Sequence, residues 1–81
     1  MGAKELRDAF SGVAPGFSCT AALLDYERHE NAEWQRLTFR GIGPDGIAFE
    51  VKSDLLPPDT HLETVARSVA KQLAGKTEPS P

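Results

Sequence analysis

Residues 34–40 alternate in character, and this alternation constrains the fold more than any other feature of the chain. Leu37 and Phe39 fall on one side of the segment, whereas Trp34 and Arg36 fall on the other. Successive side chains of a β-strand point to opposite faces of the sheet. The alternation therefore predicts a sheet with one apolar face and one face of arginine and aromatic residues.

A tight turn is predicted after this strand, at residues 43–46, which read Gly-Pro-Asp-Gly. Proline suits the second position of a type I turn, and the final glycine suits a left-handed residue. A three-residue loop that ends in this glycine pairs Phe39 with Val51 and Arg40 with Glu50. Bulky apolar residues then share one face and opposite charges meet on the other, which fixes the register of a hairpin.

An amphipathic helix is predicted near the start of the chain, over residues 3–11. Its apolar residues recur at three- and four-residue steps, and Gly12 suits the end of a helix. At about three turns this helix is too short to be stable alone, so it must pack on another element.

A second helix is predicted from the apolar stripe over residues 62–74. Thr60 and Glu63 have the spacing of a capping box at its start. Glu63 and Arg67 are spaced for an ion pair one helical turn apart. Gly75 is expected to end the helix.

Residues 17–27 are compatible with two structures. Apolar residues at alternate positions favour a strand, whereas the run of alanine and leucine at residues 21–24 also has good helix propensity. The strand is the preferred interpretation, because a helix that continued toward Leu37 would destroy the alternation after Trp34. Residues 29–33 are then expected to form the loop of a first hairpin.

The predicted fold is α+β, with the order helix, three-stranded antiparallel meander, helix (αβββα). Both helices must bury an apolar stripe and the sheet offers one apolar face, so we expect both helices on that face and the other face open. Residues 1–75 are predicted to form a single domain, which suits a chain of 81 residues. Residues 76–81 are expected to be a disordered C-terminal tail.

Composition narrows the class of protein. The net charge of −3 argues against a protein dedicated to duplex nucleic acid, which usually carries a basic surplus. Cys19 is the single cysteine, so neither an intrachain disulfide nor a thiolate metal cluster can form. No apolar run approaches the ~20 residues that span a bilayer, and no signal peptide is evident. We therefore expect a soluble, cytoplasmic protein with no membrane contact.

No group of residues in the sequence predicts a catalytic or metal site. His29, Glu30 and Glu33 lie in the predicted loop without a second histidine nearby, and His61 is distant. Cys19 is expected to face the core, where cysteine acts as a small apolar residue. We predict no catalytic activity, no metal and no cofactor.

The arginine-and-aromatic face is the one surface whose composition suggests a partner. Planar rings beside guanidinium groups can anchor a protein interface or stack nucleic-acid bases. A solvated sheet face covered by cross-strand pairs, such as Arg40 with Glu50, is the alternative interpretation. The candidate binding residues are Tyr26, Arg28, Trp34, Arg36, Thr38, Arg40 and Lys52.

Two functions are compatible with these features. The first is a non-enzymatic protein-interaction module, with a homodimer as one form, that uses this face or an edge of the sheet. The second is a module that binds single-stranded nucleic acid on the same face. Nucleic acid is the less favoured partner because the chain is acidic overall.

The order of elements resembles that of the double-stranded RNA-binding fold, which also runs helix, three strands, helix. In that family a lysine-rich start of the last helix contacts phosphates. The corresponding residues 59–63 read Asp-Thr-His-Leu-Glu, with two acids and no lysine. The resemblance therefore implies the fold but not duplex RNA binding.

Overall fold

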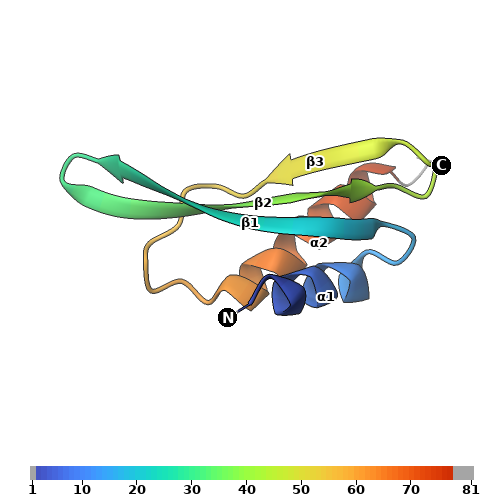
Figure 1. The fold of residues 1–81 in the computed structure, drawn as a ribbon, viewed down its shortest axis with the longest axis horizontal. Helices are drawn as coiled ribbons and strands as arrows, with labels where there is room; N and C mark the ends of the chain where they lie inside the picture. Colours follow the sequence, from blue (N-terminus) through green and yellow to red (C-terminus); the bar gives the residue numbers. More distant parts are fainter. Residues whose placement is uncertain (1, 78–81) are drawn as a thin grey trace.

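The computed structural model describes residues 2–77 and has two helices and three strands (Figure 1). Their bounds are α1 Ala3–Val13, β1 Ser18–His29, β2 Ala32–Ile42, β3 Ala48–Lys52 and α2 Leu62–Thr77. Within the predicted tail, residues 76 and 77 belong to α2, and residues 78–81 lie outside the described residues. Neither of the two helices in the described part is long and apolar enough to cross a membrane.

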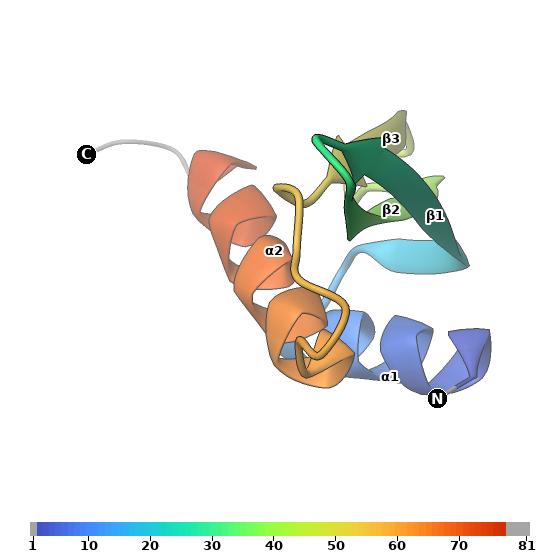
Figure 2. The ribbon, with the colours of Figure 1, turned by 90° about the vertical axis from the view of Figure 1, so that its left-hand side faces the viewer.

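The three strands form one open antiparallel sheet in the order β1-β2-β3. Both helices lie on one side of this sheet, and its other face is uncovered (Figure 2). The predicted α+β fold is thus confirmed. The β1–β2 hairpin is longer than the helix layer, and its tip extends beyond both helices (Figure 1).

The core lies between the sheet and the two helices and is built around three phenylalanines. The ring centroids of Phe10 on α1 and Phe39 on β2 are 4.8 Å apart. The ring of Phe49 on β3 stacks on that of Phe10, with 5.8 Å between their centroids. Small buried residues of α2, including Ala66 and Ala70, allow it to pack closely against α1. Burial of each large apolar side chain contributes roughly 1.5–3 kcal/mol to the free energy of unfolding.

The β2–β3 hairpin has the register that the sequence predicts, with Phe39 opposite Val51 and Arg40 opposite Glu50. Gly46 has a φ of 80°, in the left-handed region that favours glycine at this position of the loop. Turn chemistry and apolar alternation agree here, which is why the register could be read from the sequence.

Residues 17–27 belong mainly to a strand, as preferred, but the predicted loop at residues 29–33 is wrong. The chain turns through two residues only, Glu30 and Asn31, whose φ angles are 50° and 67°. Two successive left-handed residues are typical of a type I′ turn, which matches the twist of the flanking strands. His29 is therefore already paired with Ala32.

A β-bulge interrupts the β1–β2 pairing near the start of β1. Cys19 lies opposite Gly41, but Ala21 lies opposite Arg40, so one extra residue is accommodated in β1. The backbone of β1 then comes so close to Gly41 that a Cβ atom there would lie 1.9 Å from the carbonyl oxygen of Ser18. Beyond the bulge, every residue of β1 points to the face opposite to the one that simple alternation predicts.

The ends of the helices differ slightly from the predictions. α1 continues to Val13, and α2 continues past Gly75 to Thr77, so the predicted end at Gly75 is wrong. The Glu63 carboxylate accepts a hydrogen bond from Arg67 at 2.6 Å, which confirms the predicted ion pair. Helix boundaries of this kind are only weakly specified by single residues.

Substitution of Gly41 tests the close contact at the bulge. Gly41→Ala should lower the free energy of unfolding by at least about 2 kcal/mol, because backbone atoms rather than a flexible side chain occupy the space of the new methyl group. Gly12→Ala is the control, since no atom lies within 4 Å of a Cβ there and the residue is helical. It should raise stability by roughly 0.5–1 kcal/mol. Equal stability of Gly41→Ala and wild type in urea denaturation would contradict the bulge.

Candidate functional site

The uncovered face of the sheet, here called the outer face, carries five of the seven candidate binding residues. Cross-strand partners share a face, so the register assigns its members directly. The predicted residues on it are Trp34, Arg36, Thr38, Arg40 and Lys52. Its other members are Ala21, Leu23, Asp25, Glu27, Ile42, Ala48 and Glu50.

Tyr26 and Arg28 were predicted on this face, and that placement is wrong. Tyr26 is paired with Gln35 and lies on the helix side of the sheet, because the bulge shifts the alternation of β1 by one residue. Its side chain is 64% exposed, since the hairpin extends past the helices at this point. Arg28 lies on the same side, opposite Glu33.

Arg36 is held by partners within the chain. Its Nε donates a hydrogen bond to Glu27 Oε2 at 3.0 Å, and its Nη1 donates to the backbone oxygen of Ser53 at 3.0 Å. The Arg36 hydrogen bond, followed by that of His29 to the same carboxylate, lowers the pKa of Glu27. The guanidinium group therefore braces β1 against the segment that follows β3.

Arg40 is also paired, with its Nε 2.6 Å from Glu50 Oε2. Between the two arginines, Thr38 is only 3% exposed although it lies on the open side of the sheet. Long neighbouring side chains thus cover the middle of the outer face. Lys52 is the third cation of this face, and among residues 2–77 no ion pair to it is found.

The outer face is electrically balanced. Three bases, Arg36, Arg40 and Lys52, are matched by three acids, Asp25, Glu27 and Glu50. A surface that attracts the phosphates of nucleic acid requires an excess of positive charge. The arrangement on this face corresponds to the alternative interpretation, a sheet surface covered by its own cross-strand pairs.

The free edge of β3 has backbone groups for which the described residues supply no partner. The β2–β3 ladder is flanked by two hydrogen bonds, from Ser53 N–H to Leu37 O at 2.8 Å and from Gly43 N–H to Ile47 O at 2.9 Å. In an antiparallel pair every second residue bonds to the neighbouring strand, so odd-numbered residues of β3 bond to β2. The even-numbered residues direct their N–H and C=O groups outward; they are Ala48, Glu50 and Lys52.

The opposite edge of the sheet is formed by β1. By the same alternation, the residues of β1 with outward backbone groups are the even-numbered ones after the bulge, from Ala22 to Arg28. Arg7 of α1 donates a hydrogen bond to Thr20 O at 3.3 Å and so covers the start of this edge. The remainder is a long edge that no other described strand pairs with, and Tyr26 lies at its exposed end.

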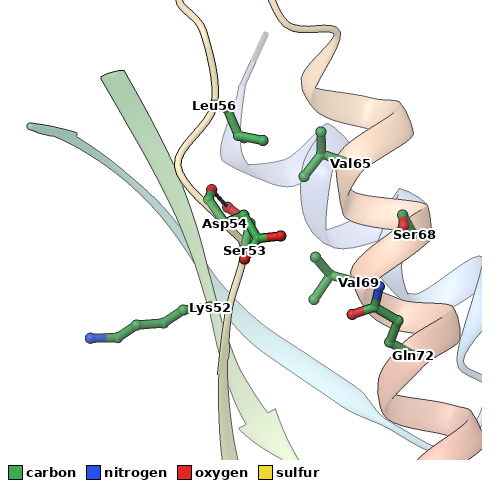
Figure 3. A pocket seen from close by; sticks show the side chains of 8 residues that line it. All are labelled: Lys52, Ser53, Asp54, Leu56, Val65, Ser68, Val69 and Gln72. Carbon is green, nitrogen blue, oxygen red and sulfur yellow. Dashed lines mark hydrogen bonds between the residues drawn. The ribbon is translucent and has the colours of Figure 1, made fainter. Parts of the chain in front are cut away.

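Two hollows lie between β3 and α2, one near each end of the strand. The first, about 180 Å³, has Val65 and Val69 of α2 pointing toward Leu56 and Ser53 (Figure 3). The second, about 220 Å³, lies beside the β2–β3 turn and is lined by apolar residues that include Leu73 of α2. We call these two hollows together the β3–α2 groove.

Ser53 shapes the rim of this groove where β3 ends. Its hydroxyl accepts a hydrogen bond from Leu37 N–H at 3.0 Å and donates one to Asp54 O at 2.8 Å. The chain bends away at Asp54 and returns to β2 at Leu56, which exchanges two backbone hydrogen bonds with Gln35. The first hollow lies between this segment and α2.

The thiol of Cys19 packs against the core. Cys19 is half-buried, burial raises the pKa of its thiol, and its Sγ contacts Ala21 O at 3.5 Å. A thiol with a raised pKa is a poor nucleophile. No cluster of three or more histidine, cysteine, aspartate or glutamate residues within residues 2–77 is placed to hold a metal ion.

Sequence reasoning missed the groove and the true composition of the outer face. The sequence does contain one indication of the correct turn, which is Asn31. Asparagine tolerates the left-handed region and suits a two-residue turn. That turn alone would have paired Tyr26 with Gln35 and moved Tyr26 to the helix side. The groove depends on the position of α2, for which no local pattern existed.

Comparison with protein-family models gives no match to this chain, and comparisons with curated proteins and with solved structures give none either.

The Glu27–Arg36 pair makes stability depend on pH. Because the folded state lowers the pKa of Glu27, the stabilisation is fully present above the ordinary value near 4.5 and is lost as pH falls through the lowered value. Glu27→Gln should be less stable than wild type at neutral pH, and this difference should shrink in acid. Urea denaturation measures the free energy of unfolding, and Glu33→Gln serves as the control. If the difference between Glu27→Gln and wild type stayed constant from neutral to acid pH, that result would contradict the pairing.

Proposed function

We propose that this chain is a small, non-enzymatic protein-interaction module that binds its partners through the open edges of its sheet. The observation that carries this proposal is the set of outward backbone groups on β1 and β3, for which the described chain supplies no partner beyond the Arg7 contact. Unpaired strand edges are the part of a sheet that most readily pairs with another chain.

The outer face supports the proposal less well than the edges do. Arg36 and Arg40 are already paired and Thr38 is buried, so a partner would have to displace internal hydrogen bonds. Displacement of a paired charge costs more than the use of a free backbone group. For the same reason, and because the face is electrically balanced, the geometry does not favour single-stranded nucleic acid.

A second copy of the chain is one partner that fits the β1 edge. Antiparallel pairing of two β1 strands would extend the sheet across a two-fold axis. If the two-fold axis passed through Asp25 or a later residue of β1, acidic residues of the two copies would lie opposite each other. The favoured axis therefore passes near Leu23 or Leu24. Leu23 is 42% exposed, and a partner strand would cover it.

The proposal also assigns the chain to the cytoplasm. Its single thiol, Cys19, is half-buried and has no second cysteine to pair with. The fold therefore needs no oxidising compartment for its stability.

Two measurements test the interaction function. Sedimentation equilibrium should show self-association through β1, and Tyr26→Lys should weaken it about tenfold or more by placing a cation at the new contact. Ile47→Lys is the matched control, because Ile47 is equally exposed but remote from β1. In parallel, selection from a library of random peptides should enrich ligands that perturb amide resonances at the strand edges.

A monomer at every concentration, together with no enriched peptide, would contradict the interaction function. Ligands that perturb Trp34, Arg36 and Arg40 instead of the edges would move the interaction to the outer face.

A further inference from the structure

The β3–α2 groove and the free edge of β3 lie side by side, and together they have the form of a strand-binding site. We propose that this groove binds an extended segment of a partner protein, which is added to the sheet as a fourth strand beside β3. The proposal rests on the protein-interaction function and names the site and the chemistry of the partner.

Backbone groups provide the first half of the recognition. The outward N–H and C=O groups of Ala48, Glu50 and Lys52 are spaced to exchange hydrogen bonds with alternate residues of an incoming strand. These contacts need no particular sequence in the partner. They hold the segment against the edge of β3.

Side-chain pockets provide the second half. The incoming residues opposite Phe49, Val51 and Ser53 direct their side chains to the helix side, because directly opposed residues share a face. Phe49 lines the second hollow and Ser53 lines the first. Two apolar side chains four residues apart therefore enter the two hollows, and a smaller one lies between them opposite Val51.

The charges around the groove specify the ends of the segment. Asp45 lines the hollow at one end and Asp54 lines the hollow at the other, and both residues are exposed. Lys52 also lines the first hollow, but its side chain extends away from α2 (Figure 3). A segment with a basic residue at each end thus complements the two carboxylates.

A second copy of this chain does not satisfy the site. Its own β3 would offer Phe49 and Val51 as the helix-side residues, and its β1 would offer Ala22 and Leu24, but all four are packed against its own core. They cannot turn into the hollows of the first copy without unfolding. The occupant is therefore a segment of another protein that is extended, apolar at positions i and i+4, and basic at both ends.

A designed peptide tests this site directly. The probe is a capped heptapeptide with lysine at both ends, leucine second and sixth, valine in the middle and threonine at the other two positions. The control peptide has the same composition with the two leucines adjacent, so that they point to opposite faces. In an NMR titration, the probe should shift the amide resonances of Ala48, Glu50 and Lys52 and slow their exchange with solvent, and the control should bind about tenfold or more weakly.

Variants separate the groove from other surfaces. Ala48→Pro removes an outward N–H group that forms no hydrogen bond to β2. It should lower the affinity for the probe peptide about tenfold. Asp54→Lys changes an exposed side chain and should weaken it several-fold through repulsion of the terminal lysine. Asp8→Lys on α1 is the matched control and should leave the affinity unchanged, because it makes the same change of charge at an exposed residue that lines neither hollow.

No saturable shift at about 1 mM probe would overturn the groove, as would binding that Ala48→Pro and Asp54→Lys leave unaltered. In either case the broader interaction function would still stand if library peptides or a second copy bound at β1. Failure of both surfaces would remove the function as well.

Discussion

The close contact of β1 with β2 at Gly41 determines what every surface of this sheet presents. Only glycine lets the Ser18 carbonyl approach so closely, and the bulge that results reverses the alternation of β1. Tyr26 is thereby moved to the helix side, and Glu27 is moved to the outer face, where it meets Arg36. A face that the sequence predicts to be arginine-rich thus becomes electrically balanced.

The polar groups of the described chain are well satisfied except along the sheet edges. No buried side-chain nitrogen or oxygen within residues 2–75 lacks a hydrogen-bond partner. The Ser53 hydroxyl even replaces a ladder hydrogen bond where β3 ends. A natural domain usually covers or blunts a free edge, so an open edge beside two hollows concentrates the capacity for interaction in one place. This contrast underlies the proposal of strand addition.

The sequence predicts the fold well because its strongest signals are local. The turn at residues 43–46 and the alternation before it give the β2–β3 register, and the apolar stripes give both helices. The face of Tyr26 was predicted wrongly, because the turn after β1 was expected to span residues 29–33 instead of two residues. The bulge could not be predicted, because it depends on a contact between Gly41 and Ser18, which are far apart in sequence. The groove was equally inaccessible, since it depends on how the packing of α2 against α1 sets its distance from β3.

Amide hydrogen exchange across β3 in the free protein distinguishes an open strand edge from a covered one, because it reports which backbone groups the sheet leaves unpaired. The account predicts an alternating pattern, with slow exchange at Phe49 and Val51 and fast exchange at Ala48, Glu50 and Lys52. Uniformly slow exchange along all five residues would show that the edge is already covered and would contradict the claim.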